Sequence, residues 1–469
     1  MPPDPGSVLL YAHALVARED LPIPAWLFAW GASIVLIVSF FVLSVAWREP
    51  RFEEDRWRPL GSGISRTALG LPTQVACGLI GLFLLWLTVY SGLRGTDAPD
   101  RNFALTFVFV TVWLGFPVLS VLVGDVFRAF NPWRAAGRAT GWAFTALTRQ
   151  RPAHAPYPGW LGRWPAAIGL VAFVWLEIVY GTSGGVSVGL SPETTAVATL
   201  CYSGYTLAMI AVFGTEEWCR RGEVFSVYFG MFSQLAPFEA RDGRLGRRMP
   251  LAGAAGWATV PGSAAMVIAS IGTTSFDGAQ EGALQGAIED TFESLVDAGI
   301  GLTSALRLTD SLYLLLCIVG IGAVFLLGVR GMRTVRGAPA FGALRSGFAH
   351  TLIPIAFAYL VAHYFSLVVF QEQAQFTYLL SDPLGTATTD IFGTASGGID
   401  YGVLSANAIW YVQVAALVVG HVVGLTLAHD RALVYWPEPR AAARSQYWML
   451  AVMVAFTCFG LYLLSQANA

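Results

Sequence analysis

The side chains best placed to do chemistry in this chain are histidines and carboxylates that interrupt long apolar segments. Four of the six histidines lie in two apolar runs between residues 345 and 431: His350, His363, His421 and His429. Two carboxylates share this setting, Glu177 in AFVWLEIVY and Asp277 in SFDG. Ionisable groups inside hydrocarbon are costly, so a membrane helix keeps them mostly where they have a function.

We predict a polar site built from His363 with Glu177 or Asp277. Imidazole together with carboxylate binds zinc or iron and can activate a water molecule, so these three residues are candidate metal ligands. Without a metal, His363 and Glu177 are candidate catalytic residues, because a histidine can act as a general base near pH 7. The structural alternatives are that Asp277 caps a following helix and that His363 bonds to a neighbouring group.

His350 and His421 form a second candidate pair. Counted at about 1.5 Å per residue from the arginines that flank their segments, both lie at a similar depth on the same side. They are therefore candidate axial ligands of one b-type haem. The spacing from His350 to His363 is 13 residues and that from His421 to His429 is 8, so the pattern does not match a dihaem cytochrome.

A secondary transporter or channel for a cation or small solute is a further alternative, with Glu177 and His363 as its titrating groups. The apolar segment TVPGSAAMVIASIGTTSF is interrupted by Pro261, Gly262 and Gly272, and broken helices are typical of transporter binding sites. The sequence contains no Walker or HExxH motif, and its five cysteines show no metal-binding spacing.

These side chains must be positioned by membrane helices. Ten apolar segments are long enough to cross about 30 Å of hydrocarbon: 26–47, 72–93, 104–127, 164–182, 194–214, 258–276, 309–330, 346–371, 404–428 and 446–466. Only 12% of the residues are charged, against about a quarter in soluble domains. We predict an all-α, polytopic helix bundle with about ten transmembrane helices, forming one domain over residues 26–466.

The arginines predict the orientation of this bundle. There is no lysine, and 24 of the 28 arginines fall in the loops after the first, third, fifth, seventh and ninth segments. Because positive loops stay inside, both termini are expected outside. Two inner stretches, near residues 128–150 and 222–238, are rich in aromatics and flanked by arginines, so we expect helices lying in the inner interface.

The remaining segments are expected on the outer side. We expect residues 1–25 to form a short outer or interfacial segment. The loops near 277–308 and 372–403 are acidic, and we expect them on the outer side as well. A net charge of −2 argues against a nucleic-acid partner. The expected partner is the lipid bilayer, with an unknown small molecule or ion as ligand. The Ala-, Gly- and Arg-rich, lysine-free composition is typical of a high-GC bacterial genome, so we expect a bacterial plasma-membrane protein.

Several segments together resemble a family of actinobacterial multi-pass membrane proteins labelled fenitrothion hydrolase. They are AHALVAREDLPIPAWLFAW, GDVFRAFNPWRA, EVFSVYFGMFSQLAPFE, SDPLG with IFGT, and WYVQVAALVVGHVVGLTLAHDRAL. The resemblance extends over most of the chain and implies hydrolysis of an organophosphate ester. It carries no catalytic motif, so it assigns no catalytic residue.

Overall fold

Membrane-length helices dominate the structure, a computed structural model that describes residues 25–466 except 53–55, 184–185, 188 and 258–259. The segment expected at 1–25 lies outside the described residues apart from its last position. The long elements are α2 (Ala25–Ala46), α4 (Leu71–Arg94), α9 (Trp164–Trp175), α10 (Pro192–Phe213), α14 (Ser263–Gln280), α16 (Leu302–Met332), α18 (Ile353–Ala374), α19 (Ala406–Tyr435) and α21 (Tyr447–Gln466).

Shorter elements connect or extend these helices. They are α3 (Ser62–Leu69), α5 (Phe103–Thr106), α6 (Phe116–Val123), α7 (Phe127–Phe130), α8 (Pro132–Thr148), α11 (Thr215–Arg221), α12 (Val224–Phe232), α13 (Ala252–Ala255), α15 (Gln285–Asp297), α17 (Phe341–Phe348) and α20 (Pro439–Ser445). Two 3₁₀ turns follow α12 and α17, η3 (Ser233–Leu235) and η4 (Ala349–Leu352).

Three stretches of the described residues are π-helical, an uncommon conformation that often marks functional sites. They are η1 (Phe107–Gly115), which joins α5 to α6, η2 (Leu176–Tyr180), which ends α9, and η5 (Gln375–Leu379), which ends α18. Glu177 lies within η2. A π-helical turn widens the helix locally and changes the direction of the side chains that follow it. The three stretches are therefore candidate parts of a functional site.

Seven helical segments among the described residues are long and apolar enough to cross a membrane, and an eighth is the pair α20–α21, bent by 43°. The chain is therefore a multi-pass membrane protein, but the predicted count of about ten is not confirmed. The two predicted segments outside this set are 164–182, which forms the short helix Trp164–Tyr180, and 258–276, which corresponds to α14.

The composition of α14 follows from its position. It packs against α9, α16, α18 and α21, and most of its side chains are buried, including Ser270, Thr273 and Thr274. The hydroxyls of Thr273 and Thr274 donate to backbone carbonyls of the preceding turn. A helix covered by other helices does not face lipid, so it can carry polar residues that lower its hydropathy.

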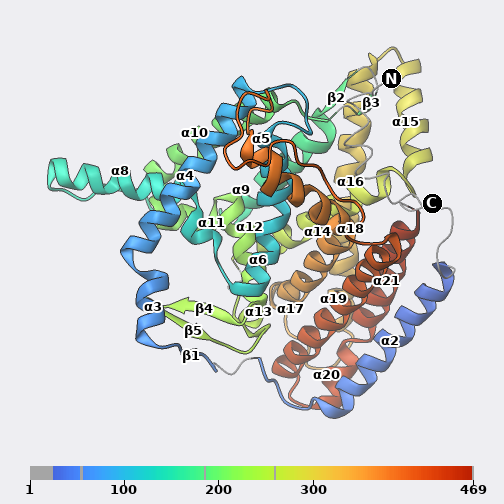
Figure 1. The fold of residues 1–469 in the computed structure, drawn as a ribbon. Helices are drawn as coiled ribbons and strands as arrows, with labels where there is room; N and C mark the ends of the chain where they lie inside the picture. Colours follow the sequence, from blue (N-terminus) through green and yellow to red (C-terminus); the bar gives the residue numbers. More distant parts are fainter. Residues whose placement is uncertain (1–24, 53–55, 184–185, 188, 258–259, 467–469) are drawn as a thin grey trace.

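One end of the bundle carries the arginine-rich loops and a small antiparallel sheet. Strands β4 (Phe238–Arg241) and β5 (Arg244–Arg247) form a hairpin, and β1 (Arg58–Pro59) adds to β5. The hairpin turns at Asp242 and Gly243, both with positive φ, as expected for an Asp-Gly turn. Figure 1 shows this sheet and helix α15 at opposite ends of the molecule. We call them the arginine-rich end and the acidic end.

The segment near 222–238 is covered by other helices. It forms helix α12, whose Tyr228, Phe229 and Phe232 are fully buried, and the helix packs against α6, α9 and α18. Its location at the inner interface stays a prediction. A short aromatic stretch satisfies either location, because the protein interior and the membrane interface both accept large rings.

Helix α8, near the second predicted interfacial stretch, projects from the side of the bundle (Figure 1). Its first turn is buried, whereas Trp142 and Leu147 expose 75% and 86% of their surface. A protruding helix with exposed large apolar side chains is typical of an element that lies in the membrane interface.

Two loops organise the acidic end. Beside α16, the short strands β2 (Thr182–Ser183) and β3 (Val186–Ser187) pair, and Arg307 donates to the carbonyls of Tyr180 and Thr182. The SDPLG motif bends back over the start of α5. The Pro383 carbonyl accepts from Phe103 N–H, and the Leu384 carbonyl from Thr96 N–H.

Candidate functional site

A His–Asp–Tyr cluster joins α14 to α18 near the acidic end. His363 Nε2 lies 2.8 Å from Asp277 Oδ2, and the Tyr364 hydroxyl donates to the same oxygen at 2.6 Å. Because an ionised carboxylate only accepts, Nε2 carries the proton in this arrangement. The cluster therefore holds His363 in one tautomer and one orientation.

The second oxygen of Asp277 is also occupied, since Gln280 Nε2 donates to Oδ1 at 2.9 Å. The carboxylate thus accepts from three side chains, two of them on the neighbouring helix α18. Gly278 permits the close approach of the imidazole, because a Cβ there would lie 3.3 Å from His363 Nδ1. The side chains of His363 and Asp277 are 17% and 11% exposed, so the pair is largely but not completely buried.

Glu177 approaches this cluster from a third helix. It is partly buried on η2 and interacts electrostatically with Asp277 and Tyr364. Helix α9, which leads into η2, packs directly on α14. The structure therefore brings the three predicted residues His363, Asp277 and Glu177 into one region, with a direct bond only between His363 and Asp277.

Metal binding by these residues stays a prediction. Within the described part of the chain, no three His, Cys, Asp or Glu side chains are grouped in a way that could hold a metal ion. His363 and Asp277 could supply two ligands, so a metal there would need further ligands from water or substrate.

The proposed haem pair is arranged differently from the expectation. Gly420 packs against Ala358 and Gly424 against the Thr351 carbonyl, so α18 and α19 touch closely where a porphyrin would have to lie. His421 Nδ1 contacts the Leu417 carbonyl at 2.7 Å, and a cavity of about 30 Å³ lies beside it. That volume holds about one water molecule. A porphyrin does not fit there.

His350 and His421 are both buried, and the Nε2 atom of each has no hydrogen-bond partner. His350 interacts electrostatically with Arg431, whereas His421 lines the small cavity together with Leu352 and Ile355. Their similar depth in the membrane stays a prediction.

His429 and the adjacent Asp430 have a structural role. Asp430 accepts from Trp47 Nε1 at 2.9 Å and from Arg51 N at 2.6 Å, while His429 Nε2 contacts the Trp47 carbonyl at 3.0 Å. These bonds tie the end of α19 to the chain that follows α2.

Two features of this region were missed from the sequence. Tyr364 and Gln280 complete the cluster. In the sequence, the available signal was that Tyr364 follows His363 and Gln280 lies one turn after Asp277.

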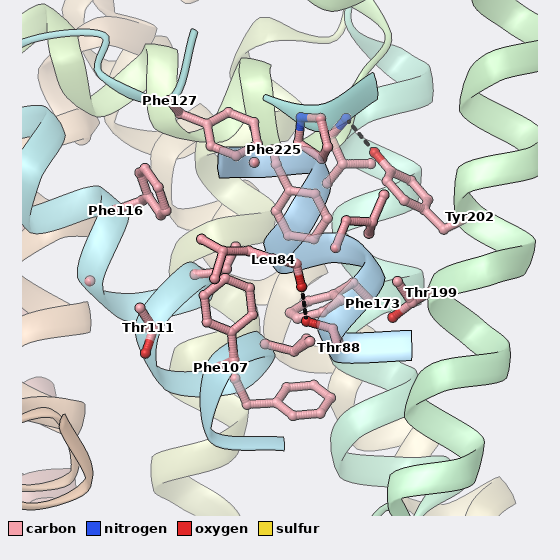
Figure 2. A pocket seen from close by; sticks show the side chains of 18 of the residues that line it. Leu84, Thr88, Phe107, Thr111, Phe116, Phe127, Phe173, Thr199, Tyr202 and Phe225 are labelled. Carbon is pink, nitrogen blue, oxygen red and sulfur yellow. Dashed lines mark hydrogen bonds between the residues drawn. The ribbon is translucent and has the colours of Figure 1, made fainter. Parts of the chain in front are cut away.

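The second missed feature is a separate cavity of about 1340 Å³ between α4, η1, α9 and α10, lined almost entirely by apolar side chains. Figure 2 shows Phe107, Phe116, Phe173 and Phe225 around it. Its lining comes from separate helices, so no single motif reveals it.

No protein-family model, curated protein or solved structure matches this chain.

Proposed function

We propose that this integral membrane protein is a hydrolase whose acid–base centre is His363 with Asp277. The observation that carries the proposal is the pairing of His363 Nε2 with a carboxylate that is itself fixed by Tyr364 and Gln280. The resemblance to membrane proteins labelled fenitrothion hydrolase favours an organophosphate ester as the substrate.

In this mechanism Asp277 orients the imidazole and stabilises the imidazolium that forms when His363 accepts a proton. His363 accepts through Nδ1 the proton of the water that attacks phosphorus, because Nε2 faces Asp277. As the bond from phosphorus to the leaving oxygen breaks, the imidazolium returns this proton to the alcohol or phenol that departs. Tyr364 acts as a positioning residue, since its hydroxyl contacts Asp277 and not the imidazole. Glu177 adds a third ionisable group in electrostatic range of Asp277.

The test is hydrolysis of a chromogenic organophosphate ester by the protein in liposomes. We expect His363→Ala to lower kcat by about 100-fold or more, the usual contribution of a general base. Asp277→Asn should lower it to a similar degree, and Tyr364→Phe should change it less. His154→Ala is the matched control, because His154 is an exposed histidine that contacts the Ala211 carbonyl.

Full activity in both His363→Ala and Asp277→Asn would refute the assignment. Zinc and iron analysis of the same samples tests the predicted metal site separately. Stoichiometric metal that is lost in both variants would support that site, and metal content unaffected by either variant would contradict it.

A second candidate function is cation- or solute-coupled proton transport. The specific observation in its favour is Glu177, a membrane carboxylate on a π-helical turn in electrostatic range of Asp277. Intramembrane carboxylates paired with histidine are typical of proton relays. Sodium, potassium or calcium gradients should then drive proton flux in liposomes, read by a trapped pH dye, and Glu177→Gln should abolish it. Flux that persists in Glu177→Gln would exclude this role.

A further inference from the structure

The large cavity has the composition of a hydrocarbon-binding site. Its volume of about 1340 Å³ exceeds the range of about 300–1,000 Å³ typical of drug-sized ligands. Its ring of phenylalanines includes Phe107, Phe116 and Phe173 (Figure 2). Ile168 and Phe376, which also line it, expose more than half of their surface, so the cavity is continuous with the surface of the bundle. In a membrane protein that surface faces lipid.

Most polar groups on the cavity wall are already bonded within the protein. Thr88 donates to the Leu84 carbonyl and Thr199 to the Thr195 carbonyl, both at 2.8 Å. Tyr202 donates to Glu223 at 2.6 Å. A ligand therefore finds no polar partners along most of the wall, and burial of hydrocarbon is the main driving force available.

The exception is Gln375, at the end of the cavity nearest the acidic end. Its side chain is 3% exposed, and its Oε1 atom has no hydrogen-bond partner. A buried acceptor without a donor costs about 1–3 kcal/mol. Glu372, one turn earlier on α18, also lines the cavity and accepts from Thr111 at 3.1 Å. The Oε1 atom of Gln375 is covered by protein, so the carboxylate of Glu372 is the acceptor at this end that a ligand in the cavity can contact.

The π-helical stretches support a function for this cavity. Thr111 lies on η1, Leu176 on η2 and Gln375 on η5, and all three line the cavity. Every π-helical stretch of the described chain therefore contributes to one site. Gln375 is the first residue of η5, so the π-helical turn begins at the residue that carries the unsatisfied acceptor.

We propose that the cavity binds a lipid-like molecule with a long hydrocarbon chain and a neutral head that donates a hydrogen bond, such as a hydroxyl. The chain fills the aromatic cavity, and the head donates to the carboxylate of Glu372. The molecule enters from the bilayer, because the apolar rim of the cavity lies on the lipid-facing surface. This site is separate from the cluster of His363 and Asp277.

The experiment is native mass spectrometry of the detergent-solubilised full-length protein with two probes, a long-chain primary alcohol and its methyl ether. The ether has the same chain but donates no hydrogen bond. We expect the wild-type protein to prefer the alcohol about tenfold, the usual effect of satisfying one buried polar group. Glu372→Leu should abolish this preference while the ether still binds, and binding of the ether shows that the variant folds.

A second pair of variants tests where the probe lies. Ala172→Trp places a large ring in the cavity and should lower the binding of both probes at least tenfold. Ala323→Trp is the matched control, since Ala323 is an exposed alanine on α16 outside the cavity. Equal loss in both variants, or none in Ala172→Trp, would place the probe elsewhere and overturn the proposal. A tenfold preference retained in Glu372→Leu would overturn the role of Glu372.

Discussion

Glu223 is fully buried, and its carboxylate accepts four hydrogen bonds. Two come from backbone N–H groups at the start of α12, of Phe225 at 3.0 Å and Ser226 at 2.8 Å. The others come from the Tyr202 hydroxyl at 2.6 Å and from Asn131 Nδ2 at 2.9 Å. Glu223 thus caps α12 and links it to α8 and α10. The segments EVFSVYFGMF and FNPWRA therefore have a structural role, because they supply the Glu223 carboxylate and its partner Asn131.

Loss of this carboxylate should destabilise the protein strongly. Glu223→Ala leaves buried donors on Tyr202 and Asn131 without an acceptor, so we expect a loss of about 3 kcal/mol in the free energy of unfolding. The nearby Glu217→Ala should cost less than about 1 kcal/mol, because Glu217 pairs with Arg220 and Arg221 at the surface. Denaturant unfolding in detergent measures both, and equal losses would contradict the assignment.

Glu216, an exposed neighbour of Glu223, is held by arginine side chains instead of neutral donors. Glu216 contacts Arg134 and Arg138, with the Arg138 ion pair at 2.8 Å. Burial works against ionisation of this carboxyl, but the two guanidinium groups outweigh it and hold the pKa of Glu216 below its usual value. The predicted inner loops therefore contain paired charges as well as the arginines that set the topology.

At the scale of elements, the apolar segments could be placed from sequence because a membrane helix needs a long run of apolar residues. The Asp242–Gly243 hairpin was also within reach of turn chemistry, although the sheet was not predicted. Helix α12 and helix α14 show the limit. Their neighbours decide whether they face lipid or protein, and α14 is surrounded by helices from both halves of the chain. A window of sequence contains no information about those neighbours.

Helix α8 provides a test of interfacial location. A spin label at Leu147→Cys should be accessible to oxygen dissolved in the bilayer, because Leu147 lies on an apolar face with Phe144. A label at Thr145→Cys, on the opposite face, should instead be accessible to a water-soluble nickel complex. Electron paramagnetic resonance in liposomes measures both. Equal exposure of the two labels to the nickel complex would show that α8 lies in water.

The candidate site shows the same limit for single residues. His363, Asp277 and Glu177 were identified because ionisable groups in apolar helices are rare. The partner of His363 could not be selected, since two carboxylates on different helices were equally available. Only the packing of α14 on α18 decides that Asp277 makes the contact.

At the scale of the whole molecule, charge is divided between the two ends (Figure 1). The hairpin of β4 and β5 carries Arg241, Arg244 and Arg247, whereas α15 carries Glu289, Asp290 and Glu293 at the opposite end. The arginines at one end are what the positive-inside rule expects on the inner side of the membrane, whereas acidic residues contribute little to that rule.

Cysteine labelling in a cysteine-free background tests this orientation. An impermeant maleimide added to intact cells should label Asp290→Cys but not Arg244→Cys, both of which are exposed positions. After the cells are opened, Arg244→Cys should react as well. The reverse pattern would invert the assigned topology, and labelling of both in intact cells would contradict a single orientation.

The bonds of Asp430 to Trp47 and Arg51 constrain the order in which the chain can assemble. Among the described helices, α2 is synthesised well before α19 and α21, against which it packs. Until those two helices are inserted, α2 lies in the bilayer without these neighbours. Retention of α2 in the fold therefore depends on the insertion of α19 and α21.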